Sequence, residues 1–261
     1  MKTLKEVLNE SLLDNVDVTM QQGTAYIRYI NSCKSIIEFI EANYELYNIG
    51  HMNINDMFII HEKPDSDDKY LVDSKVSVHL KDSSLTTLEH DLFKWNTIMG
   101  EFTCTNCNKL KSLKGSPIDV RSDIQIRKCN SLESLEGFPK KCGYSIWIQD
   151  NNSLKSLNGI CKARHSYEIT NCNSLESLEG FPANNTSGNL TLCGCGLKSL
   201  KGAPATVGGT FNIRGCKNLI SLDNFPTTVK GSVYAGECGG HFTEEDVRAV
   251  SNVKRKVYAD K

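Results

Sequence analysis

The chain lacks several features that would place it in a familiar class of protein. No apolar run approaches the roughly 18 residues that a membrane-spanning helix needs, and the opening Met-Lys-Thr-Leu-Lys-Glu lacks the apolar core of a signal peptide. The 30 Lys and Arg residues are balanced by 31 Asp and Glu, so there is no basic excess of the kind typical of nucleic-acid-binding chains. We therefore expect neither a membrane nor a nucleic acid among its partners.

Catalytic motifs are also missing from the sequence. The six His residues are scattered, and no phosphate-binding loop, nucleophile elbow or metalloprotease motif occurs. We therefore expect no enzymatic activity and no cofactor. One alternative stays open, an enzyme whose active site lies in residues 15–81, where Cys33 and a neighbouring His would form a thiol dyad.

What the chain does contain is one short sequence motif, called the leucine phrase below, that repeats at a fixed period. It first reads Leu110-Lys-Ser-Leu113-Lys-Gly115-Ser-Pro117, and its copies follow every 21 or 22 residues. The first leucines of the six copies are Leu110, Leu132, Leu154, Leu175, Leu197 and Leu219. A fixed period of this length is typical of a solenoid, in which each repeat forms one coil.

Each copy also carries a short apolar alternation before its first leucine. Ile124 and Ile126, two residues apart, are followed three residues later by Cys129. The alternation predicts a strand with one buried face, and stacked copies would align these strands in parallel. The Cys or Asn that follows can bond to backbone groups left unpaired at the turn. This column, called the Cys column below, contains Cys107, Cys129, Asn151, Cys172, Cys195, Cys216 and Cys238, and indicates about seven repeats.

Over residues 85–238 the pattern resembles the leucine-rich repeat, L-x-x-L-x-L-x-x-N/C-x-L. It departs from that family because most copies place three steps between the Cys and the next Leu, as in Cys129 and Leu132. The resemblance implies a parallel β solenoid whose strand face binds partners. About 22 residues with a Gly and a Pro leave little room for long helices on the other side, so we expect none.

Eleven cysteines raise the question of disulfides or a metal site. Six of them belong to the Cys column, and the lack of a signal peptide favours reduced thiols. Three pairs have the spacing of zinc ligands, namely Cys104 and Cys107, Cys193 and Cys195, and Cys238 and His241. These pairs lie on different coils and do not converge, so we expect no metal site.

The sequence on either side of the repeats predicts a cap at each end. Residues 15–81 combine a strand at 24–30, a helix at 33–47 and a hairpin around the turn at 64–68. Residues 241–261 begin with a capping box at Thr243, and Val247, Val250 and Val253 form one apolar helical stripe.

The predicted fold is therefore of the α+β class. Its centre is a parallel β solenoid of about seven leucine-rich-like repeats of about 22 residues, in residues 82–240. A small α+β cap in residues 15–81 precedes it, and a C-terminal capping helix in residues 241–261 follows.

Residues 1–14 predict a further helix, with Leu4, Val7 and Leu8 on one face. Its first eleven residues resemble the capsid-targeting peptides on internal head proteins of T-even-type tailed phages, since they begin Met-Lys-Thr and contain Leu8-Asn9-Glu10. The resemblance implies cleavage between Glu10 and Ser11, packaging in the virion interior and delivery to the host cytoplasm. The alternative is an uncleaved amphipathic helix that caps the fold.

The outward side chains of the predicted strands are the candidate partner-binding residues. Trp147 is prominent, because an exposed Trp with Arg127 and Glu168 on neighbouring coils has the composition of a contact hot spot. The alternative is that Trp147 only packs on its neighbours. The full candidate set is Gln125, Arg127, Trp147, Gln149, Glu168, Asn212, Arg214 and Tyr234.

The sequence thus predicts a non-enzymatic repeat protein that binds a partner protein through its strand face. The amino-terminal resemblance implies a phage protein that acts in the host. Besides the enzyme considered above, a second alternative is a structural virion or assembly protein that has no host target.

Overall fold

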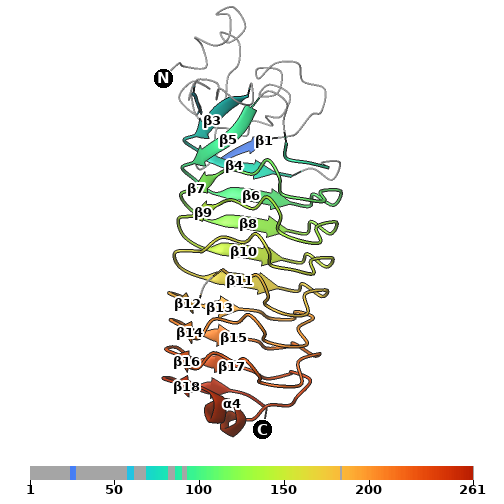
Figure 1. Ribbon diagram of the computed structural model, residues 1–261, viewed down its shortest axis with the longest axis vertical. Coiled ribbons are helices and arrows are strands. Elements are labelled where there is room, and N and C mark those ends of the chain that lie inside the picture. The colour runs from blue at the N-terminus through green and yellow to red at the C-terminus, as the bar shows by residue number, and fades with distance from the viewer. Residues whose placement is uncertain are drawn as a thin grey trace, which may run out of the picture.

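The computed structural model describes residues 24–27, 58–61, 69–81, 86–89, 93–182 and 184–260. These residues form a parallel β solenoid, a stack of coils that runs from the amino-terminal to the carboxy-terminal end of the molecule (Figure 1). Each coil contributes a strand to one long sheet on the same side, so the predicted solenoid architecture is confirmed.

The long sheet contains ten strands, and every neighbouring pair is parallel. Its inward residues are buried because each strand alternates apolar and polar positions, as in Ile124 and Ile126. In spatial order the strands are β1 (Thr24–Ile27), β4 (Ser77–Leu80), β6 (Phe102–Thr105), β8 (Ile124–Arg127), β10 (Ile146–Gln149), β11 (Tyr167–Thr170), β13 (Leu190–Thr191), β15 (Phe211–Asn212), β17 (Val233–Tyr234) and β19 (Val257–Tyr258).

A second set of strands lies on another side of the coils, and each of them except β2 comes just before a strand of the long sheet. One sheet contains β2 (Phe58–Ile60), β3 (Tyr70–Ser74), β5 (Phe93–Ile98), β7 (Asp119–Val120) and β9 (Lys141–Cys142). The other contains β12 (Asn185–Thr186), β14 (Thr206–Val207), β16 (Thr228–Val229) and β18 (Asn252–Val253). Apart from the hairpin strands β2 and β3, the sequence did not predict these strands.

The second side is interrupted between β9 and β12. Residues 161–164 of the intervening coil are described but form no strand. Tyr167, buried in β11, explains the break: its hydroxyl accepts the N–H of Ala163 at 2.7 Å and donates to the carbonyl of Cys161 at 3.3 Å. The hydroxyl of Tyr167, inside the coil, thus bonds to backbone groups of Ala163 and Cys161 that would otherwise need hydrogen-bond partners in a neighbouring strand.

The leucines of the repeated phrase fill the third side of the coil. Leu132 and Leu135 are fully buried, as are their counterparts in the neighbouring coils. A glycine follows most of these pairs and turns the chain in a left-handed conformation, at φ +83° for Gly137, and Asn224 takes this place after Leu222. A Cβ on Gly137 would lie 2.2 Å from the backbone nitrogen of Lys114 in the previous coil. Glycine here therefore serves close stacking as well as the turn.

The Cys column bonds to the backbone, but its bonds form a ladder between coils, whereas the sequence predicted bonds to backbone groups left unpaired at the turn. Each thiol donates to a strand carbonyl one coil earlier, over sulfur–oxygen distances of 3.1 to 3.8 Å. Asn151 takes the same place with a shorter bond of 2.8 Å to the carbonyl of Ile126. The described cysteines are free thiols. The donor and acceptor pairs are Cys107 to Leu80, Cys129 to Cys104, Cys172 to Ile148, Cys195 to Ile169, Cys216 to Leu192 and Cys238 to Ile213.

At the amino-terminal end the boundary of the solenoid differs from the prediction. Strands β1, β3 and β4 lie within residues 15–81, yet all three belong to sheets that continue through the repeats. The predicted hairpin is confirmed, because β2 and β3 pair in antiparallel fashion. Trp95 is buried in β5. The predicted helices at 1–14 and 33–47 lie outside the described residues.

At the carboxy-terminal end, helix α4 (Glu244–Val250) begins with the predicted capping box between Thr243 and Asp246. The predicted apolar stripe is wrong, since Val250 is 43% exposed and Val253 lies in β18. The chain then adds one more coil, β18 and β19, beyond the last predicted repeat. Within the described part of the chain, no helix is long and apolar enough to cross a membrane.

Candidate functional site

Five of the candidate partner-binding residues lie together on the outer face of β8, β10 and β11. Trp147 stands in register between Gln125 on one side and Glu168 on the other. All three side chains are partly exposed. Arg127 lies opposite Gln149, so it is a diagonal neighbour of Trp147. We call Gln125, Arg127, Trp147, Gln149 and Glu168 the Trp147 patch.

Gln149 is the least accessible member of the Trp147 patch, at 9% exposure. Its amide nitrogen donates to a carboxylate oxygen of Glu168 on the next coil. Its side-chain oxygen is buried without a hydrogen-bond donor among the described residues. The side chain therefore orients Glu168 and has little surface of its own to offer a partner.

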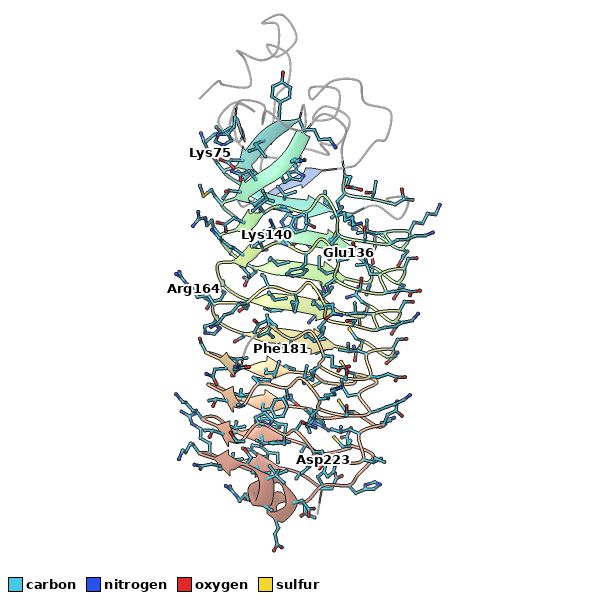
Figure 2. The ribbon with its side chains drawn as sticks, in the orientation of Figure 1. Lys75, Glu136, Lys140, Arg164, Phe181 and Asp223 are labelled. Carbon is cyan, nitrogen blue, oxygen red and sulfur yellow. The ribbon has the colours of Figure 1, made fainter. Side chains whose placement is uncertain are left out.

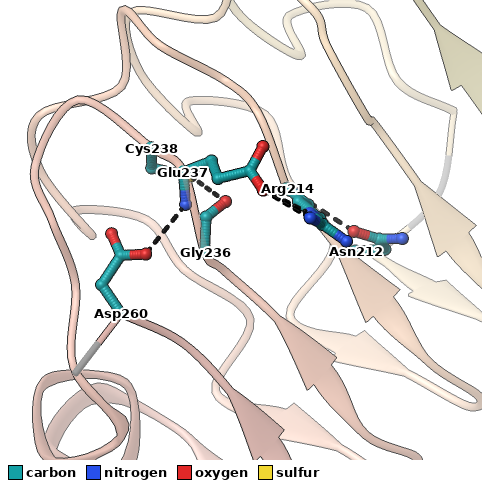
Figure 3. A network of polar contacts seen from close by, with 6 residues as sticks. All are labelled: Asn212, Arg214, Gly236, Glu237, Cys238 and Asp260. Atoms are coloured by element: carbon teal, nitrogen blue, oxygen red, sulfur yellow. Dashed lines mark hydrogen bonds and ion pairs between the residues drawn. The ribbon is translucent and has the colours of Figure 1, made fainter.

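The other three candidates lie further along the same face, beyond β13. The guanidinium of Arg214 pairs with Glu237 on the next coil, and this pairing raises the pKa of Arg214. The side-chain oxygen of Asn212 accepts the backbone N–H of Arg214 at 3.0 Å. The backbone N–H of Glu237 in turn donates to Asp260 at 3.0 Å, which extends the network to the last described residue (Figure 3). Arg214 is thus held by its neighbours while its side chain stays exposed.

Tyr234 stacks on Tyr258, with ring centroids 4.6 Å apart and planes 12° from parallel. Tyr258 is 46% exposed, so the pair presents an aromatic surface. The sequence reading missed Tyr258 because it ended the repeats at Cys238. Val257 and Ala259 repeat the alternation of Val233 and Ala235, and that signal would have found the extra coil. We call Asn212, Arg214, Tyr234 and Tyr258 the tyrosine patch.

Strand β13 separates the two patches. Its outward Thr191 lies in register between Glu168 and Asn212. Cys193, just beyond the strand, is half-buried, and burial raises the pKa of its thiol. The structure therefore divides the eight candidate residues into one group of five and one of three.

No family model, curated protein or solved structure matches this chain. The resemblances to leucine-rich repeats and to capsid-targeting peptides therefore stay predictions. The solenoid architecture rests on the strand pairing itself.

The thiols of the core do not have the properties of nucleophiles. Hydrogen bonding to Cys107 and Cys129, together with burial, raises the pKa of Cys104 well above its usual range. A reactive cysteine needs a lowered pKa and access to solvent. Among the described residues, no group of three or more His, Cys, Asp and Glu side chains is placed to hold a metal ion. Cys33 and the processing residues Glu10 and Ser11 lie outside the described residues.

Proposed function

We propose that this chain is a non-enzymatic repeat protein that binds a partner protein through the outer face of its long sheet. The observation that supports this most is the position of Trp147, partly exposed and in register between Gln125 and Glu168. Tryptophan flanked by polar groups is the typical centre of a binding hot spot. The parallel pairing on both sides of β10 holds the residue on a rigid surface, which lowers the entropy lost on binding.

The tyrosine patch extends this surface. Strand β17, which carries Tyr234, is four pairing steps from β10, or about 19 Å at about 4.8 Å a step. A partner surface of that length would contact both patches. The outward side chain of β13 between the two patches is Thr191, which is small, so no bulky group separates them at this position.

We further propose that the ends of the solenoid are closed by the segments that flank it. Helix α4 buries Val247 at the carboxy-terminal end, and the amino-terminal residues would play the same part at the other end. An open sheet edge would pair with other chains. We also propose that the repeats are related in pattern to leucine-rich repeats.

A pull-down tests the partner proposal. Tagged wild type, Trp147→Ala, and a control, Lys155→Ala, would be compared for proteins captured from the cells in which the chain is made. Lys155 is exposed and pairs with Glu133, on the side of the coil that carries the leucine phrase. A protein captured by wild type and by the control but lost from Trp147→Ala supports the proposal. Capture that is the same with all three variants, or absent from all, contradicts it.

Phage origin and packaging form a separate part of the proposal, supported by Leu8-Asn9-Glu10 near the amino terminus. Mass spectrometry of the protein from its natural source decides it. A mature chain that begins at Ser11 supports processing in a phage head, whereas an intact Met1 removes that support. A fixed, high copy number in particles without any host partner would favour the architectural alternative.

A further inference from the structure

A hollow of about 590 Å³ lies where the second side of the solenoid is interrupted. It is open to solvent and spans the coils of β7, β9 and β11. The segment whose strand is missing, residues 161–164, forms one wall, because Tyr167 draws Cys161 and Ala163 out of strand pairing. The lining residues are Asp119, Arg121, Lys140, Lys141, Cys142, Gly143, Lys162, Ala163, Arg164 and Ser187.

Five of these ten lining residues are basic, although the whole chain has a net charge of -1. Asp119 is the one acid among them, and it pairs with Arg121 at 3.2 Å. The other four, Lys140, Lys141, Lys162 and Arg164, are exposed and form no ion pair with any described residue. The hollow therefore concentrates four positive charges that no described residue neutralises.

Four lysines elsewhere in the repeats are paired with glutamates. On the side that carries the leucine phrase, Lys and Glu alternate from coil to coil and pair across neighbouring coils (Figure 2, where Glu136 is on the right and Arg164 on the left). These pairs are Lys114 with Glu136, Lys155 with Glu133, Lys198 with Glu176 and Lys201 with Glu179. What distinguishes the hollow is that four cations with no ion-pair partner among the described residues lie together around one concave surface, which offers a concentrated positive charge to an anionic ligand.

The arrangement fits a ligand with several anionic groups in a row. Lys140 and Arg164 come from neighbouring coils about 4.8 Å apart, and Arg121, which also pairs with Asp119, adds a third coil, so the row spans about 10 Å. A single small anion would bridge two of these coils at most. A chain of phosphates would follow the stack and meet a cation on each coil, as in the charged grooves that track a nucleic-acid backbone.

An aromatic pair adjoins the hollow. Tyr144 and His165 directly follow Gly143 and Arg164, two of the lining residues. Their rings stack with centroids 4.8 Å apart and planes 9° from parallel, and Tyr144 is 51% exposed. Exposed aromatic faces beside a basic groove are the platforms on which unpaired bases stack.

From the hollow and the aromatic pair we infer that this chain binds single-stranded nucleic acid. Phosphates lie along Lys140, Lys141, Lys162 and Arg164, and a base stacks on Tyr144. The site is separate from the partner-binding face and does not depend on it. The net charge of the whole sequence did not reveal the site. It counts the lysines that pair with glutamates on the leucine side of the coils together with the unpaired cations of the hollow.

Fluorescence anisotropy with labelled oligothymidylate and oligouridylate of about 12 nucleotides tests this inference. The key variant is Lys140→Ala/Arg164→Ala. Its control, Lys155→Ala/Lys198→Ala, removes the same charge from two lysines that pair with glutamates on the leucine side of the coils. Tyr144→Ala is compared with Tyr258→Ala, which removes an equally exposed stacked tyrosine from the other patch. Circular dichroism confirms that each variant folds.

At about 50 mM salt, wild type and both controls should bind, and the hollow variant should bind roughly tenfold or more weakly. The slope of log affinity against log salt should fall by about 1.4 for the hollow variant, about 0.7 for each lost phosphate contact. Tyr144→Ala should weaken binding roughly fivefold or more.

Three results would overturn the inference. The first is no binding of wild type at low salt. The second is a loss of affinity in the control Lys155→Ala/Lys198→Ala equal to that in Lys140→Ala/Arg164→Ala. The third is inorganic tripolyphosphate that competes as well as the oligonucleotide while Tyr144→Ala has no effect, which would indicate a polyanion site without base recognition.

Discussion

The side-chain oxygen of Asn151 accepts the backbone N–H of Cys129, one coil earlier, at 2.8 Å. The amide nitrogen of the same side chain donates to the carbonyls of Ile126 at 2.8 Å and Gln149 at 3.1 Å. The six thiols of the Cys column act as donors at longer distances. Asn151, which is buried, therefore ties two coils together more strongly than its neighbours in the column do.

Replacement of Asn151 should accordingly be costly. Asn151→Leu leaves the N–H of Cys129 and the carbonyl of Ile126 without this partner, so we expect a loss of about 2–4 kcal/mol in the free energy of unfolding. Asn151→Cys restores a donor to Ile126, as in the other coils, and should lose less than half as much. Urea unfolding followed by circular dichroism measures both. Equal losses for the two variants would contradict the role of the ladder bond.

Two glycines with positive φ angles should differ in their tolerance of alanine. A Cβ on Gly137 would lie 2.2 Å from the backbone of Lys114, whereas a Cβ on Gly215 meets nothing closer than 3.7 Å. Gly215→Ala should therefore lose only the left-handed backbone preference, about 1–2 kcal/mol. Gly137→Ala should lose about 2–5 kcal/mol, because overpacking between coils is added. Thermal unfolding of the two variants gives the comparison, and similar melting temperatures would argue against close stacking at Gly137.

The buried thiols predict a loss of stability at alkaline pH. Burial raises the pKa of Cys142 and Cys238 to about 11 and that of Cys161 to about 12. An unfolded thiol has a pKa of about 8.5, so the folded state retains protons that the unfolded state releases. Stability is then fully present below about pH 8.5 and falls as the pH rises toward 11 to 12. Urea unfolding at a series of pH values measures this fall.

Cys142→Val provides the matched test, because Val120 and Val207 hold the same place in other coils. The variant should be about as stable as wild type at pH 7 and should lose less stability between about pH 9 and 11. A slope identical to that of wild type would show that Cys142 does not contribute to the alkaline effect.

Tyr167→Phe should test the cause of the break in the second side. The phenyl ring keeps the contact with Phe181 but removes the hydroxyl that serves Ala163 and Cys161. We expect a loss of about 1–3 kcal/mol in the free energy of unfolding and faster amide exchange at Ala163. Tyr258→Phe, at an exposed position, should change little. Unchanged stability and exchange in Tyr167→Phe would assign the break to another cause.

The repeat period allowed the sequence to predict the strands of the long sheet from β6 to β17, but not that β1, β4 and β19 continue it. Apolar alternation identified the strands and the Cys column identified a recurring bonding position, because both repeat at a fixed separation, but the carbonyls one coil earlier that the thiols bind were not predicted. The second side could have been found too, since a buried residue recurs four positions before each long-sheet strand, as in Val120, Val207, Val229 and Val253. The sequence reading did not use this weaker column, in which Cys142, Ala163 and Thr186 replace valine.

The candidate site was predictable only in part. The outward side chains of the strands follow from alternation, so Gln125, Trp147 and Glu168 are where the sequence placed them. The burial of Gln149 depends on a hydrogen bond to the next coil, which alternation does not encode. The basic hollow depends on a tyrosine hydroxyl that displaces one strand, an effect that no residue count reveals.

The interruption between β9 and β12 also has a mechanical meaning. Elsewhere neighbouring coils are joined by strand pairing both in the long sheet and on the second side. Here the coil of β11 has strand pairing in the long sheet alone, with isolated backbone bonds besides, such as that from the N–H of His165 to the carbonyl of Tyr144. In a solenoid each coil is stabilised mainly by its two neighbours. Cooperative unfolding is therefore interrupted at the weakest interface between coils. Under force or at intermediate denaturant, the protein is expected to separate at this coil into two blocks, each unfolding as a unit.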